Sequence, residues 1–288
     1  MRETLPLLIS VPHGGHEIPP ELRERVALTE SDIFEDGDAL TREIYAFQNE
    51  VIAFIDTPIA RAFVDLNRSP FDRPPENPDG IVKTVTTMRR SVYKAGQFPD
   101  EALIERVLRA YYFPYHARID ELHTHSKIQL ALDCHSMLAQ SPPISDHPGK
   151  LRPLICLSNR GDEKGYPTEQ RGPVTCPPKW IQLLAECFCS VFEIEKSEVK
   201  INNPFFGGYI IQSHFRGDLS WIQLEINRKL YLSPPNFNAD LLAVVPERIA
   251  ELRNKILTTM KLFIKLLEKF NYADIQEKKL DYNSSEIV

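Results

Sequence analysis

Two histidines in this sequence each stand where an apolar run gives way to polar residues. His13 follows the run that ends at Val11, in SVPHGGHEIPP, and His135 closes a second run, in LALDCHSM. Ligands of open α/β sheets bind at the carboxyl ends of the strands, so histidines at two strand ends can converge there. This arrangement fits a catalytic zinc site, in which three protein ligands leave one position open for water. The sequence therefore predicts a zinc site that contains His13 and His135.

The residues beside these histidines have candidate roles of their own. Asp133 lies two positions before His135, so in an extended chain its side chain points the same way and can accept the second imidazole N–H. His16 is either a further ligand or a surface residue of its loop. The rival interpretation is a nucleophilic Ser136 with His135 as its base, but Ser136 lacks the G-x-S-x-G elbow of that chemistry.

A third ligand should be a carboxylate or another histidine. The stretch FEDGDALTREIY offers Glu35, Asp36 and Asp38 before an amphipathic run. Acidic residues near the start of a helix also serve as N-caps. Spacing alone leaves the three carboxylates as open alternatives.

Two Asn-Arg pairs follow apolar runs, namely Asn67–Arg68 in FVDLNRSP and Asn227–Arg228 in QLEINRKL. A guanidinium group binds carboxylates with two parallel hydrogen bonds. Arg68 and Arg228 beside a metal at the strand ends therefore predict a clamp for an acidic substrate.

Glu225 lies inside the apolar run WIQLEI, where an unpaired carboxylate is costly. It either pairs with a nearby arginine or works at the metal. In the second case it takes a proton from water and passes it to the leaving amine, as metal-assisted amide hydrolysis requires. The residues alone leave both interpretations open.

Gly208, Tyr209 and His116 are further candidates for the site. In NNPFFGGYI (202–210), Gly208 allows a ligand to approach the backbone and Tyr209 can donate a hydroxyl hydrogen, although a tight turn or bulge is an equal alternative. His116, in FPYHARID, is either a support for the site or a packed core histidine.

The elements that position these residues follow from the hydrophobic pattern. Short apolar runs alternate with long amphipathic ones, which predicts an α/β sheet covered by helices. Several runs are apolar throughout and predict central strands buried on both faces. The predicted strands are Leu5–Val11, Val51–Asp56, Ala62–Leu66, Ile128–Leu132, Leu154–Leu157, Tyr209–Ser213 and Trp221–Ile226. The predicted helices are Gly37–Asn49, Asp100–His125, Pro178–Phe192 and Asn238–Phe270.

The segment 69–97 is rich in proline and then basic. Its length and composition predict a lid or binding loop.

Composition limits the class of protein. The 288 residues suit one domain, residues 1–272, which ends in a long helix and is followed by a polar, flexible tail at 273–288. The net charge of −6 argues against nucleic acid or an anionic membrane as the main partner. No apolar run approaches the roughly 20 residues that span a bilayer. Five cysteines without CxxC spacing indicate reduced thiols and a cytoplasmic protein.

In their order along the chain, these motifs resemble the N-formylglutamate amidohydrolase family. The matching segments are PHGG (12–15), the acidic stretch that ends at Asp38, RAFVDLNR (61–68), TVTT followed by VYKAG (84–96), YFPYH (112–116), LDCHSM (132–137), NNPFFGGYI (202–210) and QLEINRKLY (223–231). The family is similar to the zinc exopeptidases, the carboxypeptidases and aspartoacylases. The resemblance thus implies a mixed twisted sheet between helices.

The resemblance also implies roles for individual residues. One zinc ion per chain is held by His13, Asp38 and His135, with Asp36 as the reserve for the acidic ligand, and Glu225 is the base. Asn67–Arg68 grips the substrate carboxylate.

The implied reaction converts N-formyl-L-glutamate, a small N-acylated acidic amino acid, to formate and glutamate. The chain departs from the family at Ala39 and Arg42, where an aromatic residue and an acid are usual, and His16 replaces an acid of the exopeptidases. The alternatives are a deacylase of other N-acyl amino acids or short peptides, and a zinc-binding sensor or scaffold without catalysis.

Overall fold

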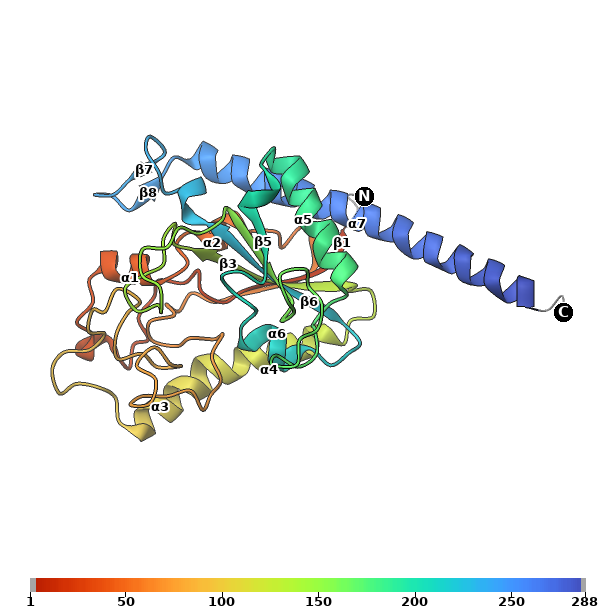
Figure 1. The fold of residues 1–288 in the computed structure, drawn as a ribbon. Coiled ribbons are helices and arrows are strands. Elements are labelled where there is room, and N and C mark those ends of the chain that lie inside the picture. The colour runs from red at the N-terminus through yellow and green to blue at the C-terminus, as the bar shows by residue number, and fades with distance from the viewer. Residues whose placement is uncertain (1–3, 286–288) are drawn as a thin grey trace.

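A six-stranded mixed sheet forms the centre of the protein, with helices on both of its faces (Figure 1). The computed structural model describes residues 4–285, and the side chains of residues 4–269. The strand order is β2–β1–β3–β6–β4–β5, and within this sheet of the described residues only β4 and β6 pair antiparallel. The strands are β1 (Leu5–Val11), β2 (Val51–Asp56), β3 (Leu130–Met137), β4 (Ile155–Ser158), β5 (Val199–Ile201) and β6 (Ser220–Asn227). The predicted α/β class with a mixed sheet flanked by helices is confirmed.

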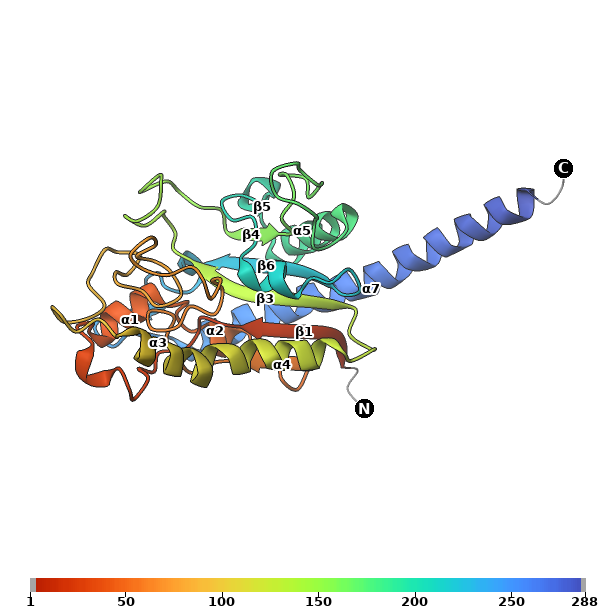
Figure 2. The same cartoon turned by 90° about the horizontal axis from the view of Figure 1, so that it is seen from below.

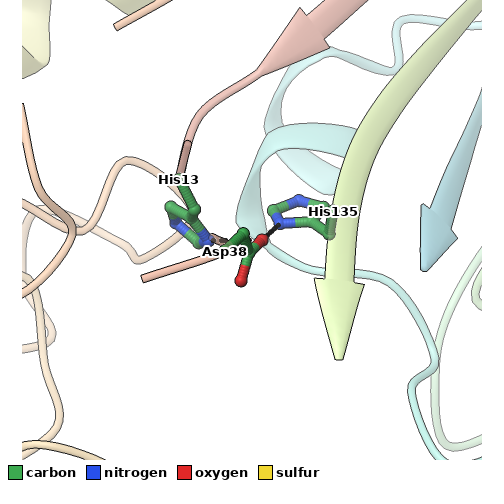
Figure 3. Close-up of side chains that lie close together, drawn as sticks. All are labelled: His13, Asp38 and His135. Atoms are coloured by element: carbon green, nitrogen blue, oxygen red, sulfur yellow. Dashed lines mark hydrogen bonds and ion pairs between the residues drawn. The ribbon is translucent and has the colours of Figure 1, made fainter. Parts of the chain in front are cut away.

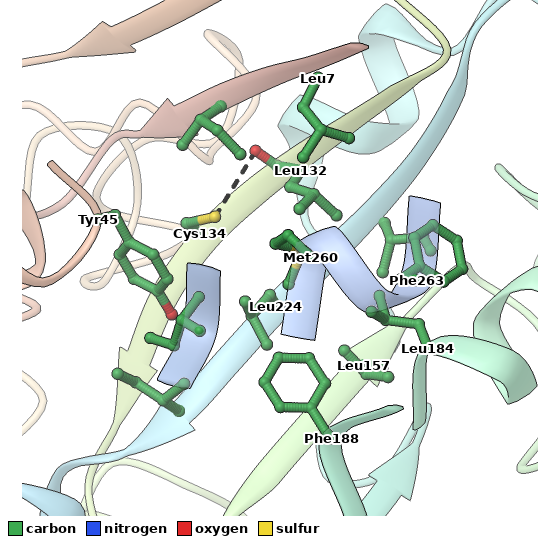
Figure 4. Close-up of a cluster of buried hydrophobic side chains, with 14 of the residues drawn as sticks. Leu7, Tyr45, Leu132, Cys134, Leu157, Leu184, Phe188, Leu224, Met260 and Phe263 are labelled. Carbon is green, nitrogen blue, oxygen red and sulfur yellow. Dashed lines mark hydrogen bonds between the residues drawn. The ribbon is translucent and has the colours of Figure 1, made fainter. Parts of the chain in front are cut away.

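Each face of the sheet carries its own hydrophobic core. The long helices α5 (Pro178–Phe192) and α7 (Pro246–Ser285) cover one face, together with α2 (Thr41–Ile44). The core on this side includes Leu132, Leu224, Phe188 and Phe263 (Figure 4). Leu132 and Leu224 come from neighbouring strands, and both are fully buried between the sheet and the helices.

The opposite face is covered by a helical layer, which lies below the sheet in Figure 1 and toward the viewer in Figure 2. This layer consists of α3 (Glu101–Val107), a π-helical turn (Leu108–Tyr112), α4 (Phe113–His123) and α6 (Tyr209–His214). The side chains of β3 and β6 alternate between the two faces, so Ala131 and Trp221 pack on this side. Because both faces are covered, the central strands are apolar on both sides.

Several predicted elements agree with the structure. Leu5–Val11, Val51–Asp56 and Pro178–Phe192 match β1, β2 and α5 to the residue. The predicted helix at 100–125 is present as α3, the π turn and α4, and the Asp100 side chain caps it by accepting from the Leu103 N–H. The predicted strands at 154–157 and 221–226 correspond to β4 and β6.

The predicted strand Ile128–Leu132 is displaced, because β3 runs from Leu130 to Met137. Its polar residues therefore lie within the strand and not after it. Asp133 and His135 keep their backbone pairing with β6, while their side chains bond to each other and to other buried polar groups. Satisfied polar groups are tolerated in a buried strand.

Two predicted strands are wrong. Ala62–Leu66 forms turns, in which the Phe63 and Val64 N–H groups bond back to the Ala60 carbonyl, and its apolar side chains fill the core without a ladder. Tyr209–Ser213 lies in the helix α6 because Gly207, at φ 108°, turns the chain and Ile210 and Ile211 then pack at helical spacing.

Of the predicted helix Gly37–Asn49 only the four residues of α2 are helical, and the difference concerns the site. Thr29 forms a capping box with Asp32 and starts α1 (Glu30–Asp36) earlier than expected. The chain then turns through Leu40, at φ 61°, before α2 begins. The interruption places Asp38 in a turn between two short helices.

The last helix begins later than predicted, at Pro246, where a proline suits the first helical position. The preceding residues form the small hairpin of β7 (Phe237–Asn238) and β8 (Ala243–Val244). The far end of α7 projects away from the sheet (Figure 1). The predicted flexible tail, 273–288, lies outside the residues whose side chains are described.

Some short elements were not predicted. These are β5, the β7–β8 hairpin and the 3₁₀ turns Arg23–Arg25, Lys196–Glu198 and Arg228–Leu230. Among the helices of the described residues, none is long and apolar enough to cross a membrane.

Candidate active site

A cavity of about 1140 Å³ opens at the carboxyl ends of the parallel strands β1, β3 and β6. Its lining includes His13, His135 and Glu225 from the ends of these strands. The segment 69–97, expected to be a binding loop, contributes another part of the wall, namely Asn77, Pro78, Asp79, Thr84, Val85, Thr87 and Arg89. An α/β sheet binds ligands at this edge, as the sequence predicted.

The side chains of His13, Asp38 and His135 come together in this cavity (Figure 3). Their ligand atoms all lie within 4.8 Å of one another, and all three residues are buried. Asp38 Oδ2 lies 3.6 Å from His13 Nδ1 and 2.9 Å from His135 Nδ1. The structure thus brings together the three residues expected to hold a metal.

The loop that carries His13 is locked to the turn that carries Asp38. The Asp38 N–H donates to the His13 carbonyl at 2.9 Å. A Cβ at Gly14 would lie 2.6 Å from Thr41 Oγ1, and one at Gly15 would lie 2.3 Å from the Pro58 carbonyl carbon. Only glycine lets the chain pass this closely, which explains the two glycines after His13.

The outer nitrogen of each histidine faces its own carboxylate. His13 Nε2 lies 2.8 Å from Asp65 Oδ1, and His135 Nε2 lies 2.9 Å from Asp133 Oδ2. A carboxylate in this position holds the proton on Nε2 and leaves the Nδ1 lone pair for a metal. Asp133 has the place expected for it. Sequence reasoning missed Asp65, although an acid within a buried run, two residues before Asn67, is the kind of signal that singled out Glu225.

The donor set fits a divalent cation. Both histidines direct their Nε2 protons to carboxylates, so their Nδ1 lone pairs point at the Asp38 carboxylate. Lone pairs repel a carboxylate, and only a proton or a cation between them makes the arrangement favourable. Burial raises the pKa of Asp38, but the hydrogen bonds and the charges of His13 and His135 together outweigh burial and hold the pKa well below its usual value. Two imidazoles and one carboxylate are a frequent ligand set for catalytic zinc.

All three guanidinium nitrogens of Arg228 donate hydrogen bonds to acceptors of the protein. Its Nε donates to Ser136 Oγ at 3.1 Å, Nη1 donates to the Glu35 carbonyl at 2.8 Å, and Nη2 donates to the Gly37 carbonyl and to Asp38 Oδ1, the latter at 3.3 Å. This placement differs from the expected substrate clamp. The guanidinium instead holds the Asp38 turn against β3, and Ser136 serves as one of its acceptors.

The other acidic candidates have different partners. Asp36 accepts from Lys83 Nζ at 3.1 Å and from the Thr87 N–H at 2.7 Å. Glu35 lies 3.3 Å from Arg90, and His16 is exposed. The structure therefore brings Asp38, and not Asp36, to the two histidines.

Glu225 stands beside the three ligands as the register partner of His135 on β6. Its side chain is 6% exposed and accepts from Gln223 Nε2 at 2.9 Å. Burial raises the pKa of Glu225 to about 7. A carboxyl group with a pKa near neutrality is suited to act as a general base.

Asn67 and Arg68 lie at the rim of the site. Asn67 Nδ2 is 3.2 Å from His135 Nε2, and Asn67 Oδ1 accepts from the Ile210 N–H at 2.7 Å. Arg68 donates to Asp79 Oδ2 at 2.9 Å, and its side chain remains 36% exposed and lines the cavity. The guanidinium can therefore reach a ligand.

Gly208 and Tyr209 occupy different surroundings. A Cβ at Gly208 would lie 2.3 Å from Asn67 Nδ2, so glycine leaves room for this amide. Tyr209 is not among the described residues that line the cavity, and its ring lies edge-on to His116, with 5.7 Å between centroids. The expected hydroxyl donor thus points elsewhere.

His116 supports the Asn67 segment from behind. Its Nε2 lies 3.0 Å from the Leu66 carbonyl and its Nδ1 lies 2.8 Å from His214 Nε2. Among the described residues His116 bonds to none of the three ligands. It was expected to support them directly, but it contacts only the segment that precedes Asn67.

Comparisons with known proteins identify the family of the chain and proteins with a similar fold. The family model for N-formylglutamate amidohydrolase matches residues 5–232. The N-formylglutamate amidohydrolase of Ralstonia eutropha JMP134 is similar in structure, with a TM-score of 0.71, 19% identity and coverage of 93% of this chain and 95% of that chain. A gene product of Agrobacterium tumefaciens has a TM-score of 0.61, 16% identity and coverage of 91% and 90%.

A metallo-carboxypeptidase of Burkholderia cenocepacia also matches, with a TM-score of 0.33, 16% identity and coverage of 91% of this chain and 57% of that chain. The comparison with curated proteins found no match. The family model covers most of the chain, and the order of the motifs and the fold agree with it. The chain belongs to the N-formylglutamate amidohydrolase family.

Proposed function

We propose that this protein is a zinc-dependent amidohydrolase that converts N-formyl-L-glutamate and water to formate and L-glutamate. One observation carries the proposal. A compact set of two histidines and an aspartate, His13, Asp38 and His135, lies beside a buried glutamate, Glu225, in a cavity at the strand ends. Family membership supplies the substrate class.

His13, Asp38 and His135 would hold the metal ion. When bound, a zinc ion supplies Lewis acidity, which polarises the acyl carbonyl and lowers the pKa of water. Asp65 and Asp133 keep the two imidazoles in the tautomer that binds metal, and Arg228 keeps the Asp38 turn in place.

Glu225 would move the proton. As a carboxylate it takes a proton from the attacking water, and as a carboxylic acid it returns that proton to the amine nitrogen when the C–N bond breaks. Because burial raises the pKa of Glu225 to about 7, both the carboxylate and the carboxylic acid are populated near neutral pH. Gln223 holds one of its oxygens and so orients the other.

Arg68 would bind a substrate carboxylate through a charge-assisted hydrogen bond, with Asn67 beside it. The existing bond to Asp79 fixes the guanidinium before the substrate arrives. A pre-oriented arginine loses less entropy on binding.

The cavity also favours a second candidate. Its volume of about 1140 Å³ exceeds what a formyl group and a glutamate side chain occupy, and part of its wall is apolar, with Met137, Leu138, Phe205 and Phe206. A deacylase of N-acyl amino acids with larger acyl groups fits this wall.

The direct test measures formate release from N-formyl-L-glutamate by the zinc-loaded protein, with N-acetyl and N-hexanoyl glutamate as parallel substrates. Glu225→Gln should reduce kcat by at least about 1000-fold, while metal content and folding are kept. Bound zinc without turnover of any of these substrates contradicts the proposal and favours a sensor or scaffold.

A further inference from the structure

Five arginines line the cavity, and four of them are bonded to protein acceptors. Arg61 donates to Asp65, Arg68 to Asp79, Arg89 to a backbone carbonyl and Arg228 to Asp38. The fifth, Arg152, makes no side-chain hydrogen bond or ion pair with any residue whose side chain is described, and its Nε is buried without an acceptor.

The position of Arg152 is well defined although its charge is unmatched. Its backbone N–H donates to the Ala139 carbonyl at 3.0 Å, and its own carbonyl accepts from Asn227 Nδ2 at 3.2 Å. Its guanidinium carbon lies 4.9 Å from the centroid of the Phe205 ring. Backbone anchors and an aromatic surface hold the head group in the cavity wall.

A cation that is half-buried without a partner loses part of its hydration, and this loss lowers its pKa. Burial lowers the pKa of Arg152, and Glu225 raises it by a smaller amount. Glu225 accepts from Gln223, and among the described side chains no hydrogen bond or ion pair joins it to Arg152. A donor that is left unsatisfied in a cavity is best explained by a ligand acceptor.

We infer that Arg152 binds the second carboxylate of a dicarboxylic N-acyl amino acid, while Asn67–Arg68 receives the first. The inference rests on the proposed function and adds the residue that selects for an acidic side chain. Two anionic groups then meet two separate cations of the cavity lining, Arg68 and Arg152. A neutral side chain leaves Arg152 without an anionic partner. A site loses affinity when its buried donor has no partner.

The test compares N-formyl-L-glutamate with N-formyl-L-glutamine, which has the same shape and lacks the side-chain charge. Arg152→Met removes the charge and the donors and leaves a shorter, unbranched side chain in the cavity wall. It should lower the ratio of kcat/KM for the glutamate derivative to kcat/KM for the glutamine derivative about 10- to 100-fold. This ratio cancels the effect on Glu225, whose pKa the Arg152 charge lowers. Arg152→Lys should restore part of the loss. Arg171→Met is the matched control, since Arg171 stacks on Phe206 and lies outside the cavity lining.

A binding measurement separates this inference from the proposed function. Calorimetry of the zinc-loaded protein should show tighter binding of L-glutamate than of L-glutamine, and Arg152→Met should remove the difference. This result supports the inference even if no formyl substrate is turned over. Equal losses on both substrates, no loss on either, or equal binding of the two amino acids by the wild type overturns it.

Discussion

His135 and Glu225 are register partners on the parallel strands β3 and β6, so their side chains leave the sheet on the same face. The same alternation places Asp133 beside His135 and Gln223 beside Glu225. One rigid pair of strands thereby carries a metal ligand, the proposed base and the groups that orient both. Sites built on paired strands hold their geometry more closely than sites on loops.

The first prediction concerns the metal. The wild-type protein should contain one zinc ion per chain, and a His13→Ala/His135→Ala double variant should lose it, because two of the three ligands disappear. Elemental analysis after dialysis measures both. Wild type without stoichiometric zinc, or full zinc retention in the double variant, contradicts the metal site.

Asp65 gives a second prediction. Asp65→Asn removes the carboxylate that faces His13 Nε2 and should weaken zinc affinity about 10- to 100-fold. Competition with a chromogenic chelator measures the affinity. Asp56→Asn, which changes an acid paired with Arg42 away from the cavity, is the control. Equal affinities of Asp65→Asn and wild type would show that His13 needs no such partner.

A third prediction follows from the raised pKa of Glu225. The base must be deprotonated to accept a proton, so activity should fall as the pH drops through its pKa. Burial raises this pKa to about 7, while a divalent cation nearby favours the carboxylate. We therefore expect the acidic limb of kcat/KM to lie between about pH 4.5 and 7. A limb at or below pH 4 would indicate a solvated carboxylate and contradict the assignment.

The stability of the fold should depend on pH through His116. Burial, and then the charge of His214, lower the pKa of His116 to about 4. The unfolded chain binds this proton with a pKa near 6.5, so the contribution is complete above pH 6.5 and is lost as the pH falls towards 4. The loss amounts to about 3 kcal/mol of the free energy of unfolding.

Urea unfolding at several pH values measures this effect. His116→Gln removes the titrating group and should flatten the fall in stability between pH 6.5 and 4, whatever its stability at pH 7. His125→Gln changes an exposed histidine and serves as the control. Parallel curves for wild type and His116→Gln would assign the pH dependence to other groups.

Local patterns in the sequence were enough to predict much of the fold. The apolar runs of β1, β2 and β6 and the proline-led α5 depend on hydrophobic periodicity and on capping, which act over a few residues. The placement of His13 after β1 followed from the same patterns. They also put His135 after the end of its strand, whereas the structure has it within β3. The family resemblance added Asp38 and Glu225, and the family model confirms the resemblance itself.

The tertiary structure decided what depends on contacts between distant segments. The apolar run 62–66 looks like a strand but has no neighbouring strand to pair with, and 209–213 becomes a helix because a glycine turn redirects it onto the core. Asp65 faces His13 across 52 positions, and Arg228 reaches Asp38 across 190. The spacing of residues along the chain does not predict such contacts, because these side chains meet only when the distant segments fold together. The same holds for Arg152, whose lack of a partner becomes visible only when every other arginine of the cavity has found one.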